Sequence, residues 1–165
     1  MKEYVCKIAS IEEMNDKWNF EILNNKDSFN WLMWKNEAIS RAKNGKSIVF
    51  YGLLNGKPVA EATAVLDKSE VQNGNGLVDE KTAYLCAFRT VKRFQGKGYF
   101  SQLFSFMIEI LKKKGYEKVT LGVEPEDKAN LSIYKKYGFT EYIKSSSEKY
   151  PDGTEINVDY YGMKL

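Results

Sequence analysis

A turn with two glycines is the segment best suited to bind a phosphate group. Residues 95–100 read Gln-Gly-Lys-Gly-Tyr-Phe and stand between a β-rich run and an amphipathic run. Glycine lets the backbone turn sharply and approach a ligand. The N–H groups and the dipole at the start of the following helix favour an anion, and Lys92, Arg93 and Lys97 add positive charge. These features predict a pyrophosphate site; a plain connecting turn with a solvated basic face is the alternative.

Two better-known phosphate motifs do not match this turn. A Walker A loop requires Gly-Lys followed by Ser or Thr after four spacer residues, and the chain lacks that pattern. A dinucleotide fingerprint requires a third glycine three residues after the second, but the residues after Gly98 are Tyr99, Phe100 and Ser101. Nucleotide hydrolysis and nicotinamide chemistry are therefore not indicated.

The acid–base chemistry must be done without histidine, because the chain has none. Serine–histidine and cysteine–histidine nucleophile pairs are excluded, so a base would be a carboxylate, a tyrosine or water. The two cysteines, Cys6 and Cys86, lie in apolar runs. We expect neither a disulfide framework nor a metal site.

The composition is that of a soluble globular protein. The chain has 165 residues, which fits one domain over residues 1–165, and a formal net charge of +3. The basic residues are spread along the chain, so nucleic-acid binding is not indicated. No apolar run reaches about 18 residues and no signal peptide is evident, so we expect a cytoplasmic protein without membrane contact.

Hydrophobic periodicity and turn signals predict a mixed α/β sheet. A capping box at Ser10 and Glu13 begins the first helix, and the second begins at Asp27 or Ser28 and ends at Asn44-Gly45. Residues 67–81 are polar and are expected to form an exposed connection. The predicted strands are 5–9, 47–54, 58–66, 82–91, 118–123, 139–149 and 155–164, and the later helices begin near residues 98 and 127.

Two motifs in this order resemble those of the GNAT superfamily of N-acetyltransferases. The family's Arg/Gln-x-x-Gly-x-Gly/Ala turn is matched at Gln95, Gly96, Lys97 and Gly98, followed by Leu103 in the helix. A second pattern, a strand and then a helix ending Tyr-x-x-x-Gly-Phe, is matched at residues 121–123 and 134–139. The motifs cover residues 82–139. The resemblance implies a splayed, mostly antiparallel sheet flanked by helices, and transfer of an acetyl group from acetyl-CoA to an amine.

The resemblance also implies roles for individual residues. The end of the strand near Phe88 would pair with the pantetheine arm, the turn would hold the pyrophosphate, and Tyr134 would protonate the departing thiolate. Two departures stand out, because Phe100 replaces a small residue and Asp127 replaces an asparagine; Asp127 is expected to cap its helix instead. The implied acetyl-CoA contacts are Phe88, Thr90, Gln95, Gly96, Lys97, Gly98, Phe100, Ser101 and Asn130.

The base that deprotonates the amine is predicted at Glu124, directly or through water. Glu124 follows the predicted strand 118–123, where a splayed sheet would open onto the thioester. A loop carboxylate without a role is the alternative, and Glu61 is a second choice. Tyr134 could equally be a packing residue. Direct transfer is favoured over an acyl-Cys86 intermediate, because Cys86 has no histidine partner.

The acceptor is predicted to be a small-molecule amine. A peptide or protein amine and a non-catalytic acetyl-CoA-binding module are the alternatives. Four aromatic residues of the first two helices either line the acceptor pocket or pack in the core: Trp18, Phe29, Trp31 and Trp34. The exposed edge of the C-terminal hairpin suggests a homodimer.

Overall fold

The computed structural model describes residues 2–25 and 29–165. The predicted start of the second helix, at Asp27 or Ser28, lies outside the described residues. The capping box is confirmed, because the Ser10 hydroxyl accepts from the Glu13 amide and the Glu13 carboxylate accepts from the Ser10 amide. This pair fixes the start of the first helix, which carries Lys17 and Trp18 toward the interior.

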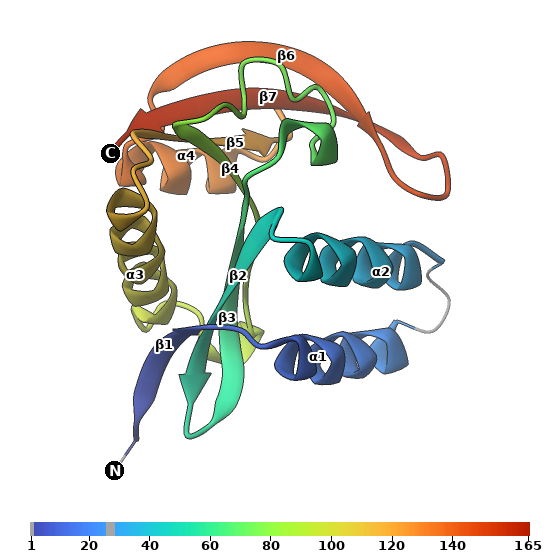
Figure 1. Cartoon of the computed structure of the whole chain (residues 1–165), viewed down its shortest axis with the longest axis vertical. Coiled ribbons are helices and arrows are strands. Elements are labelled where there is room, and N and C mark those ends of the chain that lie inside the picture. The colour runs from blue at the N-terminus through green and yellow to red at the C-terminus, as the bar shows by residue number, and fades with distance from the viewer. Residues whose placement is uncertain (1, 26–28) are drawn as a thin grey trace.

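One seven-stranded sheet runs through the molecule in the order β1-β2-β3-β4-β5-β7-β6 (Figure 1). Among the described strands, β4 and β5 pair in parallel and the other neighbours pair antiparallel. The mixed α/β fold and the order of helices and strands are as predicted. The elements are β1 (Tyr4–Ile8), α1 (Ile11–Asn24), α2 (Phe29–Lys43), β2 (Ser47–Leu54), β3 (Lys57–Val65), β4 (Thr82–Thr90), α3 (Tyr99–Lys113), β5 (Lys118–Val123), α4 (Lys128–Tyr137), β6 (Glu141–Lys149) and β7 (Glu155–Lys164), with short 3₁₀ helices η1 (Lys68–Glu70) and η2 (Lys92–Phe94).

Helices cover both faces of the β1–β4 part of the sheet. Figure 1 shows α1 and α2 on one side of these strands and α3 on the other. The apolar stripe of α3, formed by Leu103, Met107 and Leu111, is fully buried against the sheet. Met14 of α1 packs with Val49 and Tyr51 on the opposite face. Burial on both faces fixes β3 and β4, the strands that carry the candidate site.

The sheet divides between β4 and β5. These strands are paired only from Thr82 to Tyr84 on β4, although β4 continues to Thr90 and β5 to Val123. The β3–β4 pairing is also interrupted between Glu61 and Thr63, and Ala87 there has a φ of 55°. This irregularity bends β4 away from β5. The splayed sheet is therefore present, and its opening lies beside the second half of β4.

The connection over residues 67–81 differs from its prediction as an exposed segment. Leu77 is fully buried and Val78 is nearly so, and both pack against Val158 and Tyr160 of β7. The Thr120 hydroxyl donates to the Leu77 carbonyl. The surrounding Asn and Gly residues dominate the local polarity, whereas two adjacent apolar residues are enough to anchor the segment over β5 and β7.

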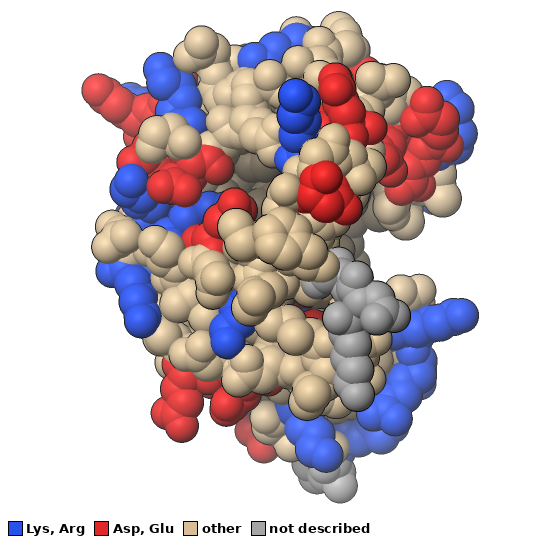
Figure 2. Space-filling view, turned by 90° about the vertical axis from the view of Figure 1, so that its right-hand side faces the viewer, with Lys and Arg blue, Asp and Glu red and all other residues tan. Residues whose placement is uncertain are grey.

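Charges of both signs are spread over the face formed by the free ends of α1 and α2 and the β6–β7 turn (Figure 2). This face lacks the uninterrupted basic patch typical of nucleic-acid-binding proteins. In residues 2–25 and 29–165, no helix is both long and apolar enough to cross a membrane.

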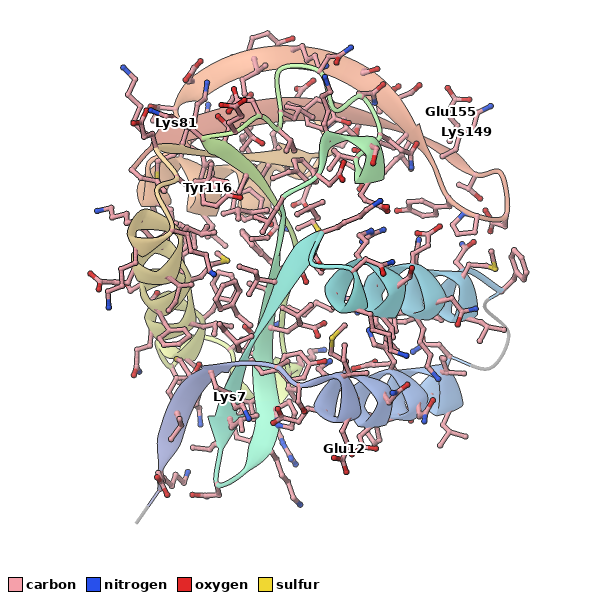
Figure 3. The ribbon with its side chains drawn as sticks, in the orientation of Figure 1. Lys7, Glu12, Lys81, Tyr116, Lys149 and Glu155 are labelled. Carbon is pink, nitrogen blue, oxygen red and sulfur yellow. The ribbon has the colours of Figure 1, made fainter. Side chains whose placement is uncertain are left out.

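The C-terminal hairpin ends beside α2. Lys149 and Glu155 form the last pair of β6 and β7 before the turn (Figure 3). Beyond this pair, the Asn30 amide of α2 donates to the Asp152 carboxylate at 3.0 Å, and the Asp152 amide donates to the Asn30 side-chain oxygen at 2.9 Å. The hairpin turn and α2 are thus bridged at the side of the molecule where α1 ends and α2 begins.

Candidate active site

The two-glycine turn has the backbone geometry of an anion-binding loop. Gly96 and Gly98 have φ values of 74° and 82°, and Gly98 is the N-cap of α3. An ideal Cβ placed on either glycine would have no atom within 4 Å. Outside the helix itself, no amide from Gly96 to Ser101 donates to an acceptor within the described part of the chain. These N–H groups therefore face open space at the positive end of the helix dipole.

A cavity of about 450 Å³, here called the turn cavity, opens beside this turn. Lys97 is exposed and does not line it. The predicted acetyl-CoA contacts that do line it are Phe88, Thr90, Gln95, Gly96, Gly98, Phe100, Ser101 and Asn130. The motif thus gathers its residues around one space. Lining residues that sequence reasoning missed are Arg89, Phe94, Tyr99, Ile133 and Tyr137. Helical spacing from Asn130 and Tyr134 would have indicated Ile133 and Tyr137.

Phe100 packs inward from the turn. Its ring centroid lies 5.0 Å from that of Phe88, whose own ring lies 5.8 Å from Tyr134. Aromatic rings at these separations and tilts attract one another. The bulky residue that departs from the family motif therefore belongs to an aromatic wall between the turn and α4. The Ser101 and Tyr137 hydroxyls are also hydrogen-bonded at 2.9 Å.

Tyr134 retains its proton at neutral pH. Burial, with a smaller effect of the Asp127 carboxylate, raises the pKa of its phenol. The ring lines the turn cavity and also a cavity of about 220 Å³, here called the middle cavity. A protonated hydroxyl shared by two cavities can act as a general acid between them.

Asp127 caps α4, as the sequence predicted. Its carboxylate accepts from the Asn130 backbone amide at 3.1 Å and from the Asn130 side-chain amide at 2.7 Å. These bonds hold Asn130 at the edge of the turn cavity. They also explain why an aspartate is tolerated near a candidate anion site, since its charge is directed to the helix N-terminus.

Three carboxylates line the middle cavity together with Tyr134: Asp127, which caps α4, Glu124 and Glu148. Glu124, the predicted base, follows β5 and is exposed. Glu148, which sequence reasoning missed, is half-buried on β6. Its position in a strongly polar strand gives no local signal, because only the folding of the hairpin over β5 brings it to Tyr134.

A third cavity, of about 590 Å³, lies between α1, α2 and strands β2 to β4; we call it the large cavity. Trp18, Trp34 and Tyr51 line it, and Glu148 closes the end that meets the middle cavity. Trp31 instead packs edge-on between Trp18 and Trp34. Phe29 is 57% exposed. Of the predicted aromatic cluster, two members line the cavity and Trp31 supports them.

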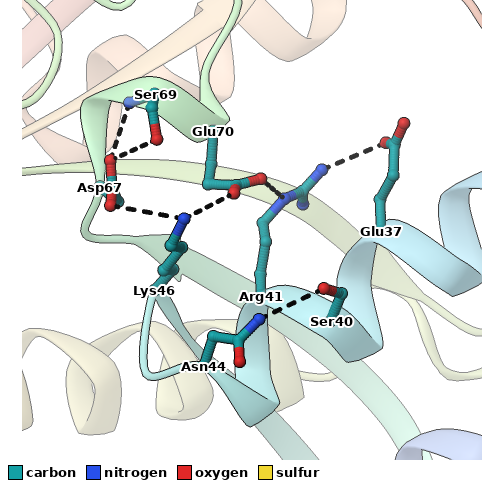
Figure 4. Close-up of polar contacts among 8 residues, drawn as sticks. All are labelled: Glu37, Ser40, Arg41, Asn44, Lys46, Asp67, Ser69 and Glu70. Atoms are coloured by element: carbon teal, nitrogen blue, oxygen red, sulfur yellow. Dashed lines mark hydrogen bonds and ion pairs between the residues drawn. The ribbon is translucent and has the colours of Figure 1, made fainter.

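Most charges around the large cavity are paired within the protein. Glu61 binds Lys17 at 3.2 Å and Arg89 at 3.3 Å. Arg41 binds both Glu37 and Glu70 at 3.3 Å, as Figure 4 shows. Each oxygen of the Glu61 carboxylate thus has a cationic partner, which leaves neither oxygen free for an amine.

Cys86 also lines the large cavity, but its thiol is a poor nucleophile. Burial raises its pKa to about 11, which leaves it protonated at neutral pH. Because the thiolate is the nucleophilic form, this environment argues against an acyl-cysteine intermediate. In the part of the chain that the structure describes, no group of Cys, Asp or Glu is placed to hold a metal ion.

Comparison with known proteins identifies the family. The acetyltransferase (GNAT) family model matches residues 8–139. N-alpha-acetyltransferase 30 of Schizosaccharomyces pombe is 28% identical over 92 residues, 56% of this chain. The match spans about 58% of that curated relative's length. The chain therefore belongs to the acetyltransferase (GNAT) family.

Solved structures share the fold over almost the whole chain. The ribosomal-protein-S18-alanine N-acetyltransferase from Escherichia coli has a TM-score of 0.69 at 16% identity, covering 99% of this chain and 94% of that one. The PaiA N-acetyltransferase from Thermoplasma acidophilum, in complex with coenzyme A, has a TM-score of 0.64 at 14% identity, covering 99% of both chains. The splayed sheet with its flanking helices is thus the GNAT fold.

Proposed function

We propose that this protein is an acetyl-CoA-dependent N-acetyltransferase that moves the acetyl group directly to the primary amine of a small molecule. The observation that carries the proposal is the position of Tyr134. Its phenol lines both the turn cavity and the middle cavity, and the middle cavity meets the large cavity at Glu148. Donor and acceptor would therefore approach from opposite sides of one proton-donating group.

Acetyl-CoA suits the turn cavity on chemical grounds. The open amides from Gly96 to Ser101 match a pyrophosphate, and the positive φ of both glycines keeps side chains out of its way. The unpaired end of β4, from Phe88 to Thr90, offers backbone groups to the amides of a pantetheine arm. The relative solved with coenzyme A has the same fold.

Catalysis requires two proton transfers near Tyr134, one from the amine and one to the departing sulfur. The attacking amine must be neutral, and a lysine-like amine with a pKa of about 10.4 is neutral only about once in 10³ molecules at pH 7. A carboxylate that takes the first proton removes this barrier, and Glu124 remains the base predicted from the sequence. Tyr134 then donates its proton to the departing sulfur, so that a thiol leaves in place of a thiolate.

The bridged end of the large cavity favours a small acceptor over a peptide. Asn30 and Asp152 exchange two hydrogen bonds, and the Trp34 and Tyr150 rings pack edge-on with centroids 5.3 Å apart. These contacts join α2 to the β6–β7 hairpin. An extended peptide needs an open groove, whereas a small amine fits a space closed in this way.

An Nα-acetyltransferase acting on peptides or proteins is the second candidate. The observation in its favour is the similarity to N-alpha-acetyltransferase 30 and to the ribosomal-protein-S18-alanine N-acetyltransferase. A purely acetyl-CoA-binding module is the third, and the protonated Tyr134 in a cavity that Glu124 and Glu148 also line argues against it.

The direct test is coenzyme A release from acetyl-CoA in the presence of pooled amines: polyamines, amino acids, aminoglycosides and short peptides. Release with a small-molecule pool supports the proposal, and release with peptides alone supports the second candidate. No release in any pool, with no binding of acetyl-CoA by calorimetry, contradicts the acetyltransferase assignment.

Asn30→Ala should broaden the acceptor range. Removing both bridging bonds frees the hairpin turn from α2, at a cost of about 1–3 kcal/mol in the free energy of unfolding because Asn30 is buried. We expect kcat/KM for a tetrapeptide amine to rise relative to that for the best small amine. Asn44→Ala, near the other end of α2, is the control. An unchanged peptide-to-small-amine ratio would show that the bridge does not select the acceptor.

Two further expectations belong to this proposal. Cys6 and Cys86 are both free thiols, which suits a reducing compartment such as the cytoplasm. Strand β6 forms one edge of the sheet, and its backbone would allow a second copy to pair with it in a homodimer. Sedimentation analysis would test the dimer.

A further inference from the structure

Glu148 occupies the junction between the large and middle cavities. It lines both, and Tyr134 lines the middle cavity from α4. Glu124 lines the middle cavity alone. The Glu148 side chain is therefore in contact with both the large cavity and the cavity beside Tyr134.

Glu148 is also the carboxylate of the large cavity whose charge is not balanced. Four glutamates line this cavity, and three of them are ion-paired. The pairs are Glu37–Arg41, Glu61–Lys17, Glu61–Arg89, Glu70–Arg41 and Glu70–Lys46. Within residues 2–25 and 29–165, no Lys or Arg nitrogen lies within 4.0 Å of the Glu148 carboxylate. A cationic acceptor would supply the missing charge.

A hydrogen-bond relay fixes the orientation of this carboxylate. The hydroxyl of fully buried Tyr160 donates to Glu148 Oε2 at 2.5 Å, and Asn73 Nδ2 donates to the Tyr160 hydroxyl at 3.1 Å. Among the described residues, Glu148 Oε1 accepts no hydrogen bond. One oxygen is therefore held by the protein and the other is available to an ammonium group.

We propose that Glu148 is the catalytic base and that the acceptor is an alkyl ammonium ion drawn to it through the large cavity. This inference rests on the proposed function and replaces Glu124 in the proton-accepting role. The Glu148 carboxylate takes one proton from R–NH₃⁺ and later releases it to solvent. The neutral nitrogen forms the N–C bond and the C–S bond breaks. Sulfur receives the Tyr134 proton, and the proton lost by nitrogen restores Tyr134 through solvent.

The protonation of Glu148 gives this role a pH signature. Burial raises the pKa of Glu148, partly offset by the Tyr160 hydrogen bond. Because the base acts only when ionised, activity should fall as the pH drops through this raised pKa. The other titratable or charged groups that line the cavities around it are Tyr51 of β2; Tyr84, Cys86 and Arg89 of β4; Glu37 and Arg41 of α2; Glu61 of β3; Glu70 of η1; Tyr134 of α4; Glu124 and Asp127 after β5; Tyr150; and, bonded to Glu148 itself, Tyr160 of β7.

Few of these neighbouring groups can produce the same fall of activity at low pH. Raised pKa values keep the phenols and the thiol protonated through the acid range. Glu37, Glu61 and Glu70 are ion-paired, and Asp127 is bound to Asn130. Glu124 is therefore the competing base.

The test is Glu148→Gln, assayed by coenzyme A release with the alkyl amine that the pooled screen selects. At pH 7 we expect kcat/KM to fall by about 10²-fold or more, the contribution typical of a positioned base, and the acid limb of the pH profile to disappear. A β,β,β-trifluorinated analogue of the same amine is largely neutral at pH 7 and should lose much less. Glu141→Gln, the same change on an exposed part of β6, is the control and should match the wild type.

Tyr160→Phe provides a second measurement that does not remove the base. Without the hydroxyl the carboxylate loses a stabilising donor, so the acid limb should move to higher pH while the fold is retained. If Glu124→Gln abolishes the limb and Glu148→Gln leaves it in place, the inference is overturned. If Glu148→Gln lowers kcat/KM equally for the alkyl amine and its fluorinated analogue, the inference is also overturned. Absence of wild-type turnover with every amine overturns the proposed function as well.

Discussion

Tyr134→Phe is expected to lower kcat about 10²-fold while the dissociation constant of acetyl-CoA stays nearly unchanged. Burial keeps the phenol protonated, and Tyr134, the proposed proton donor, lines both the turn and the middle cavity. A positioned acid typically contributes 10²–10⁴-fold, and the lower value corresponds to about 2.7 kcal/mol of transition-state stabilisation. Phenylalanine retains the ring contact with Phe88, so binding should persist. Steady-state kinetics and calorimetry measure the two quantities.

The matched control for this substitution is Tyr116→Phe. Tyr116 packs on the core at the C-terminal end of α3, away from the cavities (Figure 3). The Tyr116→Phe substitution should leave both kcat and the dissociation constant of acetyl-CoA unchanged. A Tyr134→Phe protein with wild-type kcat would show that Tyr134 is a packing residue. A large loss of acetyl-CoA affinity would show instead that its hydroxyl serves binding.

Phe139→Ala should lower the free energy of unfolding by about 3–5 kcal/mol, the range for removing a buried aromatic side chain. Phe139 is fully buried, and its ring lies 6.1 Å from Phe104 of α3 and 6.5 Å from Tyr134. The substitution leaves a cavity where α3, α4 and the sheet meet. Urea unfolding followed by circular dichroism, at matched protein concentrations, would measure the loss.

Phe139→Leu is the control for size, because leucine fills most of the space and should cost clearly less. The alanine variant should also lower kcat beyond the effect of partial unfolding, since Tyr134 loses its support. A loss below about 1 kcal/mol for Phe139→Ala would mean that the site collapses around the smaller side chain.

Local signals explain how much of the fold was predictable. The capping box at Ser10 and Glu13, the Asn55-Gly56 hairpin turn and the strand at residues 118–123 were all predicted correctly, because each depends on neighbours in sequence. The connection at residues 67–81 was predicted only in part, because several of its residues are exposed as expected but Leu77 and Val78 are buried. Its burial depends on Leu77 meeting Tyr160, a contact between residues far apart in the chain.

The residues of the candidate site also fall into those with a local sequence signal and those without one. The turn from Gln95 to Gly98 and the residues of α4 were found because a motif has fixed spacing. Glu148 was missed because its relation to Tyr134 exists only after β6 pairs with β7 and β7 pairs with β5. Lys97 was included for its charge, but a side chain at the tip of a turn need not face the cavity that the turn's backbone lines.

The short pairing between β4 and β5 has a consequence for cooperativity. Within the described part of the sheet, β4 and β5 share only three residue pairs, and the turn cavity has Phe88 of β4 on one side and Tyr134 of α4 on the other. A molecule bound there would link two parts of the protein, β4 on one side and α4 on the other. Part of its binding free energy would then oppose the separation of these two parts. Occupancy by the donor would thereby set the rigidity with which the acceptor is received.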